Sequence, residues 1–307
     1  MDNFYCVKDN TWCIDTGYAL IGVYKLNDRD VILIDSGTAY MLNEAEKILP
    51  VLEENRFNVK AVICTHGHWD HIGNNEILRK KYKCKIYMYG EEAYSSISEN
   101  GIIFTRMLLP YNEEMKKTFS YMTTHVDEFI SHDAKYILVC GRRFDIIHTP
   151  GHSASHISVI TEDNVCVVGD VIMTENEITK TKIPYACNFG IDFASKRKLL
   201  ELDCDKYIIA HRGVRNDIKD EVEANINYLK YRADVVLSYI EDGMCYDEIA
   251  AAVINCMNIK IHSRFIFSDI HGMIMPYVQY LEESGKIEAR YEKGYMRYYV
   301  TDYHDEE

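Results

Sequence analysis

The seven residues from Thr65 to His71 include three histidines and an aspartate. They read Thr-His-Gly-His-Trp-Asp-His and directly follow the apolar run from Lys60 to Cys64. Neither a hydrophobic core nor an ordinary surface needs this density of imidazole and carboxylate groups, which are ligand types that zinc and iron prefer. The motif therefore predicts a metal site at the end of a buried strand.

The spacing within this motif predicts two metal ions. Alternate side chains of an extended chain share a face, so His66 and His68 can converge on one ion. His71 has the opposite parity, and Asp70 precedes a helical pattern over 72–82. These last two side chains can therefore face a second ion.

Three further candidate ligands follow later apolar runs. His152 ends the Thr-Pro-Gly-His motif after the run 143–148, Asp170 follows the run 164–168, and His211 follows the run 206–210. Binding residues are often placed where strands of a rigid sheet end at one cleft. We therefore expect these three residues to complete the site.

The order of these motifs resembles that of the metallo-β-lactamase superfamily of hydrolases. The resemblance covers roughly residues 15 to 215 and includes an early aspartate motif, Ile34-Asp35-Ser36-Gly37. It implies an α+β fold in which two sheets pack face to face and helices cover both outer faces, an αββα four-layer sandwich.

The same resemblance implies seven metal ligands: His66, His68 and His152 for the first ion, Asp70, His71 and His211 for the second, and Asp170 bridging the two. Asp35 would brace the histidine loop, and His156 is expected to be a supporting histidine rather than a ligand. Two divalent ions are expected, with zinc favoured and iron or manganese as alternatives.

Two ions in these positions predict a hydrolytic reaction. Zinc lowers the pKa of a bound water to about 7, so a bridging hydroxide is available at neutral pH. It would attack an ester-like carbonyl or a phosphorus atom without a covalent intermediate. Asp70 is the expected catalytic residue, because it could orient the hydroxide or receive its proton.

The chain pattern predicts two strand-rich halves within a catalytic domain spanning 1–215. The expected strands are 19–26, 31–34, 59–64, 85–89, 136–139, 143–148, 156–161, 165–168 and 207–210, and the expected helices are 40–54, 72–82 and 195–202. Tyr185 and Asn188 lie in an expected loop, 181–192, that is placed at the border of the cleft.

An insertion at about 92–135 interrupts this pattern of strands and helices. Methionine and aromatic residues, among them Met107, Met115 and Phe119, recur there at roughly helical intervals. A helical pair with its own small core is the favoured interpretation. The alternative is a lid whose side chains shape an apolar substrate pocket.

The residues 216–307 predict a C-terminal domain that resembles a winged helix. Helices are expected at 217–240, 246–254 and 268–284, followed by a hairpin over 285–300. From residue 220 to the end there are 17 acidic and 8 basic residues, a net charge of −9. Because nucleic-acid binding needs clustered cations, a packing, lid or dimerisation role is favoured, and a homodimer is one expectation.

Composition restricts the environment and partners of the chain. The net charge of −14 argues against a protein that coats nucleic acid. The ten cysteines contain no Cys-x-x-Cys pair, the start lacks a basic and apolar leader pattern, and no run approaches the ~18 apolar residues of a membrane span. These features predict a cytoplasmic enzyme with free thiols and no membrane partner.

Several functions remain open on these residues. The first is a hydrolase acting on a small-molecule thioester, lactone or related acyl compound. The second is a ribonuclease or phosphodiesterase that uses the same two metals. The third is an iron-dependent persulfide dioxygenase, and the fourth is a metal-responsive regulator that uses the C-terminal domain, which its acidic charge disfavours.

Overall fold

The computed structural model describes residues 3–38, 44–105, 119–120 and 122–302. Its first sheet has seven strands in the spatial order β1 to β7: Phe4–Lys8, Thr11–Asp15, Leu20–Lys25, Asp30–Ile34, Asn58–Cys64, Lys85–Tyr89 and Glu128–Ile130. Strands β1 to β4 pair antiparallel, and β4 to β7 pair parallel.

The second sheet has six strands in the spatial order β13-β12-β11-β10-β9-β8. In chain order these are Tyr136–Val139, Arg142–His148, Ile157–Ile160, Val165–Gly169, Lys206–Ile209 and Gly213–Arg215. Strands β11 and β12 are parallel, and all the other neighbours are antiparallel. The carboxyl ends of β11 and β12 therefore lie at the same edge of this sheet.

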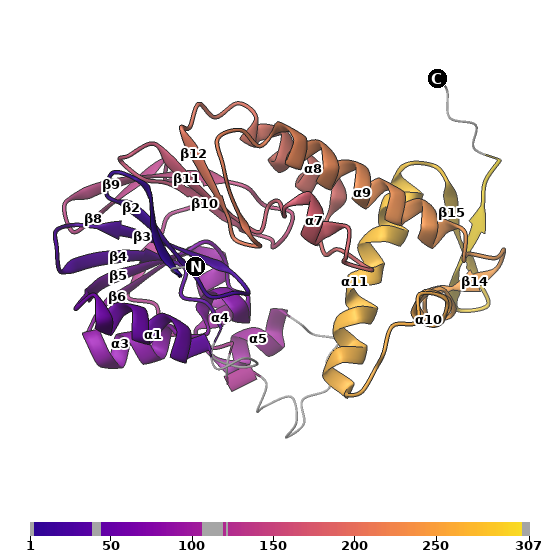
Figure 1. Ribbon diagram of the computed structural model, residues 1–307. Coiled ribbons are helices and arrows are strands. Elements are labelled where there is room, and N and C mark those ends of the chain that lie inside the picture. The colour runs from indigo at the N-terminus through magenta and orange to yellow at the C-terminus, as the bar shows by residue number, and fades with distance from the viewer. Residues whose placement is uncertain (1–2, 39–43, 106–118, 121, 303–307) are drawn as a thin grey trace.

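The alternation of apolar residues explains why the two sheets stack. In β4, Ile32 and Ile34 belong to the core between the sheets, whereas Val31 and Leu33 belong to the outer core under the first helical layer. Side chains of a strand alternate between its faces, so a strand buried on both faces reads as a continuous apolar run. The predicted αββα sandwich is confirmed (Figure 1).

Helices lie outside both sheets (Figure 1). In the first half of the chain they are α1, α2, α3, α4 and α5: Glu44–Glu54, Trp69–Ile72, Asn75–Tyr82, Gly90–Ser96 and Glu99–Thr105. In the second half they are α7, α8, α9, α10 and α11: Glu175–Ile178, Phe189–Leu199, Lys219–Leu237, Tyr246–Cys256 and Arg264–Glu283. Of these, α10 packs on α11 and the C-terminal strands rather than on either large sheet. No helix in these described segments is both long and apolar enough to cross a membrane.

The C-terminal residues form three helices and a small sheet. Strand β14 (Met244–Cys245) lies between α9 and α10, and the hairpin of β15 (Ile287–Glu292) and β16 (Tyr295–Val300) follows α11. The three strands form one sheet in which β16 pairs with both β14 and β15. One hydrophobic cluster includes Phe193 of α8, Val222 of α9 and Tyr277 of α11, so the core is continuous across residue 216. The domain boundary and the winged-helix assignment stay predictions.

Several predicted element boundaries are wrong. The helix expected at 72–82 is two helices, α2 and α3, because the Asn74 side chain donates to the Ser36 carbonyl at the break. Helix α8 begins at 189 rather than 195, since Asn188 accepts a hydrogen bond from the Ile191 N–H as its N-cap. Helix α11 begins at 264 rather than 268, with Ser263 as its cap.

The insertion at about 92–135 is only partly helical. It ends in β7, which adds a seventh strand to the first sheet, and its described helices are α4 and α5. Ile102, Phe119 and Met122 form a small buried cluster there. Met107 and Met115 lie outside the described residues.

Candidate metal centre

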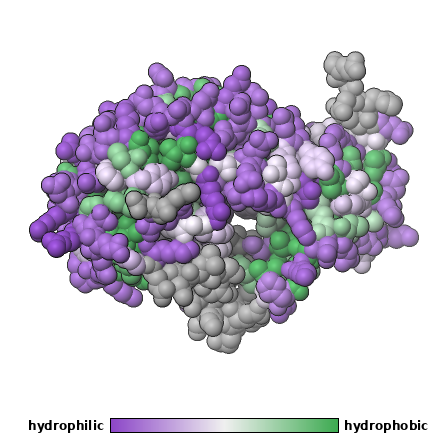
Figure 2. Space-filling model, in the orientation of Figure 1, coloured by the Kyte–Doolittle hydropathy of each residue, from purple (hydrophilic) through white to green (hydrophobic). Residues whose placement is uncertain are grey.

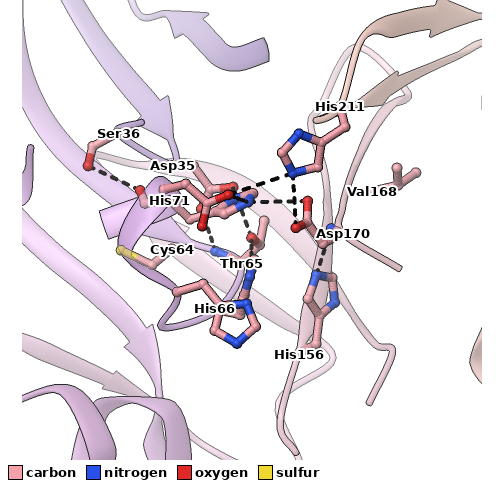
Figure 3. Close-up of polar contacts among 12 residues, drawn as sticks. Asp35, Ser36, Cys64, Thr65, His66, His71, His156, Val168, Asp170 and His211 are labelled. Carbon is pink, nitrogen blue, oxygen red and sulfur yellow. Dashed lines mark hydrogen bonds and ion pairs between the residues drawn. The ribbon is translucent and has the colours of Figure 1, made fainter. Parts of the chain in front are cut away.

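The candidate ligands reach one edge of the sandwich from both sheets. The loop after β5 and helix α2 bring His66, His68, Asp70 and His71, while the chain after β9, β11 and β12 brings His152, Asp170 and His211. Backbone hydrogen bonds join the sheets beside this edge, from the Leu20 N–H to the Ala210 carbonyl and from the Ile157 N–H to the Thr65 carbonyl. Figure 3 shows side chains from the two sheets pointing towards one another.

The first group contains His66, His68 and His152. One nitrogen from each ring lies within 4.8 Å of the others. The Nε2 atom of His152 lies 2.9 Å from the Nδ1 atom of His68. The Nε2 atom of His66 is buried and has no hydrogen-bond partner. The three imidazole nitrogens are therefore close enough together to hold one metal ion.

The second group contains Asp70, His71, Asp170 and His211, whose ligand atoms also lie within 4.8 Å of one another. The Nε2 atoms of His71 and His211 each lie 3.2 Å from a carboxylate oxygen of Asp170. Asp70 Oδ2 lies 3.7 Å from His211 Nε2 and 3.9 Å from His71 Nε2.

Asp170 lies between the two groups. Its Oδ2 atom is 3.2 Å from His211 Nε2 in the second group and 3.5 Å from His152 Nε2 in the first. One carboxylate therefore faces both positions. This is the placement that the predicted bridging role requires, and the bridging itself stays a prediction.

The donor set fits a pair of divalent metal ions. His66 Nε2 is a buried atom without a hydrogen-bond partner, and buried His71 Nε2 and Asp170 Oδ1 make no hydrogen bond beyond their ion-pair contact of 3.2 Å with each other. Buried polar atoms are normally satisfied, so each such exception needs an explanation. Imidazole nitrogens and carboxylate oxygens in groups of three and four are the ligands that zinc and related ions take.

The charge states of the metal-free groups differ. Burial holds the pKa of His66 and of His152 well below the usual range, so these rings are neutral. Burial would also lower the pKa of His71, but the carboxylates of Asp170, Asp35 and Asp70 raise it well above its usual value. Metal ligands must be deprotonated, so metal binding at the second group would release a proton from His71.

Asp35 supports the histidine loop through three hydrogen bonds. Its Oδ1 atom accepts from the Thr65 N–H at 2.7 Å, and its Oδ2 atom accepts from the Thr65 hydroxyl at 2.9 Å. The same oxygen lies 2.8 Å from His71 Nδ1. Asp35 is 1% exposed. The contacts are those expected of a residue that fixes the orientation of a metal-binding histidine.

His156 lies outside both ligand groups and contacts the backbone that carries Asp170. Its Nε2 atom accepts a hydrogen bond from the Asp170 N–H at 3.0 Å, and its Nδ1 atom lies 2.8 Å from the Thr149 hydroxyl. Burial lowers the pKa of His156 to about 3, so the ring is neutral and can accept this hydrogen bond. These contacts are compatible with the supporting role expected of His156, which stays a prediction.

We expect Gly169→Ala to disturb this arrangement. Gly169 has φ +61°, and an added Cβ atom would lie 2.5 Å from His156 Nε2. The left-handed conformation and the clash together should lower the free energy of unfolding by about 3 kcal/mol, measured by urea denaturation. Gly141→Ala is the matched control, because Gly141 has φ +76° with no atom within 4 Å. Its cost should be about 1 kcal/mol, and equal costs would contradict the role given to His156.

Glu92 is a supporting residue that the sequence analysis missed. Its Oε2 atom accepts from the Gly67 N–H at 2.9 Å, and its Oε1 atom accepts from the Ser153 hydroxyl at 2.5 Å and the Ser155 N–H at 3.2 Å. It thereby joins the loop of His66 and His68 to the loop of His152. No local pattern signals this role, since its partners lie 25 to 63 residues away.

The two groups border a cavity of about 1430 Å³. His68, Asp70, His152, Asp170 and His211 line it, together with residues of α10 and α11. Tyr185 borders it as predicted, with its ring centroid 5.9 Å from that of His68. Asn188 instead caps α8. Both halves of the chain therefore shape the space above the candidate ligands.

The sequence comparisons identify related proteins. Residues 14–211 match the sequence model of the family described as "Metallo-beta-lactamase superfamily". The chain is 27% identical over 203 residues to "Hydroxyacylglutathione hydrolase GloC" of Haemophilus influenzae, covering 65% of this chain and 87% of that protein. It is 21% identical over 206 residues to "Probable metallo-hydrolase YqgX" of Bacillus subtilis, covering 66% and 89% of the two chains.

Two solved structures share the fold over most of the chain. A metallo-beta-lactamase family protein of Thermus thermophilus aligns with a TM-score of 0.68 at 18% identity, covering 92% of this chain and 94% of that one. A beta-lactamase domain protein of Burkholderia ambifaria aligns with a TM-score of 0.65 at 16% identity, covering 97% and 93%. The likeness in fold therefore extends into the residues that follow 216.

Proposed function

This chain belongs to the metallo-beta-lactamase superfamily, and on that premise we propose that it hydrolyses an ester-like bond of a small molecule, preferably a thioester or lactone, with two zinc ions. The observation that carries the proposal is the convergence of seven histidine and aspartate side chains in two groups, five of which line one large cavity. The name of the Haemophilus influenzae relative, a hydroxyacylglutathione hydrolase, supports a thioester.

We assign the first ion to His66, His68 and His152, and the second to Asp70, His71 and His211, with Asp170 shared. Such a pair of ions supplies a water of lowered pKa and a positive charge that polarises a substrate oxygen. Asp35 and His156 hold the ligand-bearing segments in place through the hydrogen bonds described above. Preorganised ligands of this kind need no rearrangement during the reaction.

Asp70 is the proposed proton acceptor. It is 8% exposed and lines the cavity, so its carboxylate lies between buried ligands and the space open to substrate. A carboxylate in this position can hold the proton that an attacking water loses and deliver it to the departing group. Asp70 would therefore act first as a general base and then as a general acid.

Acidic charge favours a small acyl substrate over nucleic acid. The residues from 220 to 307 carry a net charge of −9, and the whole chain carries −14. A phosphodiester polymer would be repelled unless a basic groove overrode this charge. Two alternative activities remain to be tested against acyl hydrolysis: that of a phosphodiesterase and that of an iron-dependent persulfide dioxygenase.

The test is a substrate screen of the purified protein loaded with zinc. Thioesters, lactones, a generic phosphodiester and a β-lactam are compared, and metal content is measured after aerobic purification. We expect thioester or lactone turnover, with kcat/KM at least about 100-fold lower in His68→Ala. His125→Ala, an exposed histidine, is the control and should leave turnover unchanged.

Two results would overturn the proposal. Turnover of the phosphodiester alone would assign a phosphodiesterase. One iron per chain together with oxygen uptake on a persulfide would assign a dioxygenase.

A further inference from the structure

The cavity extends well beyond the candidate ligands, and one side of it is apolar. Its volume of about 1430 Å³ exceeds the roughly 300–1000 Å³ of ordinary small-molecule sites. Helices α10 and α11 contribute Ile254, Phe265, Phe267 and Met273, which we call the α10–α11 wall. Figure 2 shows hydrophobic residues gathered beside a hollow over the lower part of α11.

The wall is fixed to the rest of the molecule. Phe265 packs against the buried cluster of Ile102, Phe119 and Met122 from the insertion. The Tyr277 hydroxyl of α11 donates to the Pro184 carbonyl, and the Tyr246 hydroxyl of α10 donates to the His271 carbonyl. Phe267 remains 48% exposed although it lines the cavity. An apolar ring held open to a cavity is a surface that a ligand can cover.

The charged residues of the lining are mostly acidic. Apart from the candidate ligands, the described lining includes five carboxylates: Glu91, Glu92, Glu177, Asp247 and Asp269. Arg212 is the one arginine or lysine among those described lining residues. An anionic group away from the metals would find few partners here.

We propose, on the basis of the function proposed above, that the substrate is an uncharged or cationic acyl compound with an extended apolar chain. The carbonyl would lie at the metal groups, and the apolar chain would lie along the α10–α11 wall. Glutathione thioesters, whose tripeptide carries two carboxylates, would be poor substrates. The C-terminal residues thereby select the substrate of a site built by the two sheets.

The test compares thioesters that differ in one property at a time. Acetyl, hexanoyl and decanoyl thioesters of N-acetylcysteamine vary the chain length with an uncharged thiol. Hexanoyl thioesters of N-acetylcysteamine, thiocholine and glutathione vary the charge of the thiol with one acyl group. We expect kcat/KM to rise at least about tenfold from acetyl to decanoyl, and to be at least about tenfold lower for glutathione than for the other two thiols.

Variants test whether the cavity lining causes the preferences for chain length and for thiol charge. Phe267→Ser should lower the ratio of decanoyl to acetyl turnover about tenfold. Tyr291→Ser is the matched control, because Tyr291 is an 82% exposed aromatic residue of the hairpin, and its ratio should match that of the unaltered protein. Asp247→Lys should raise relative turnover of the glutathione thioester, whereas Glu288→Lys on the hairpin should not.

A binding measurement separates this inference from the proposed function. Trp69 lines the cavity and Trp12 is the other tryptophan, so a Trp12→Phe protein reports on the cavity by fluorescence. We expect decyltrimethylammonium to shift this emission, and Phe267→Ser to weaken the binding about tenfold. Binding that depends on Phe267, without hydrolysis of any thioester or lactone, would overturn the proposed function but not the role of the α10–α11 wall. Hydrolysis without dependence on chain length, or binding unaffected by Phe267→Ser, would overturn the wall alone.

Discussion

Asp170→Asn should lower kcat/KM by about a thousandfold and reduce bound metal from two ions per chain to one or fewer. The reason is its position, since one oxygen lies within 3.5 Å of His152 Nε2 and within 3.2 Å of His211 Nε2. Asparagine keeps the shape of the side chain but removes its negative charge. Two adjacent cations would then repel each other with no shared anion between them.

Two measurements on the same protein preparation test the effect of Asp170→Asn. Elemental analysis gives the metal content, and steady-state kinetics give kcat/KM. Asp133→Asn is the control, because Asp133 is an exposed aspartate whose Oδ1 atom accepts a hydrogen bond from the nearby Ser131 hydroxyl, and both readouts should stay at the unaltered level. A folded Asp170→Asn protein that kept two ions and most of its activity would show that Asp170 does not join the two positions.

Asp35→Ala should lower the free energy of unfolding by about 3 kcal/mol or more and weaken metal binding at the second group about 10- to 100-fold. The substitution leaves three buried donors without their acceptor: the Thr65 N–H, the Thr65 hydroxyl and His71 Nδ1. Each unsatisfied buried group costs about 1–3 kcal/mol. His71 also loses the contact that orients its ring.

Urea denaturation and zinc titration measure the two effects of Asp35→Ala. Asp35→Asn is the matched variant, because its amide oxygen can still accept from Thr65 while its amide nitrogen faces the ring of His71. It should therefore retain more stability than Asp35→Ala but share the loss of metal affinity. If both variants bound zinc as tightly as the unaltered protein, Asp35 would have a structural role only.

The ends of apolar runs were the most informative part of the sequence. The run 60–64 and the runs before Asp170 and His211 are largely buried strands, the run before His152 is a partly buried strand, and the side chains that follow these strands lie at one edge. This convergence could be predicted because it depends on local pattern and on the order of the strands. That the converging side chains bind metal is still a prediction.

Other parts of the site depend on contacts between distant residues and could not be predicted. Glu92 supports two loops through partners far along the chain. Helix α2 contains Asp70 and His71, although its four residues are too few to show a periodic pattern. The contribution of α11 to the cavity follows from how its helix packs on α8 and α9, which periodicity does not specify.

X-ray diffraction from zinc-loaded crystals at the zinc absorption edge tests the central claim most directly. The account predicts two anomalous peaks, one among His66, His68 and His152 and one among Asp70, His71 and His211, with Asp170 facing both. A single peak, or peaks away from these residues at saturating zinc, would contradict it.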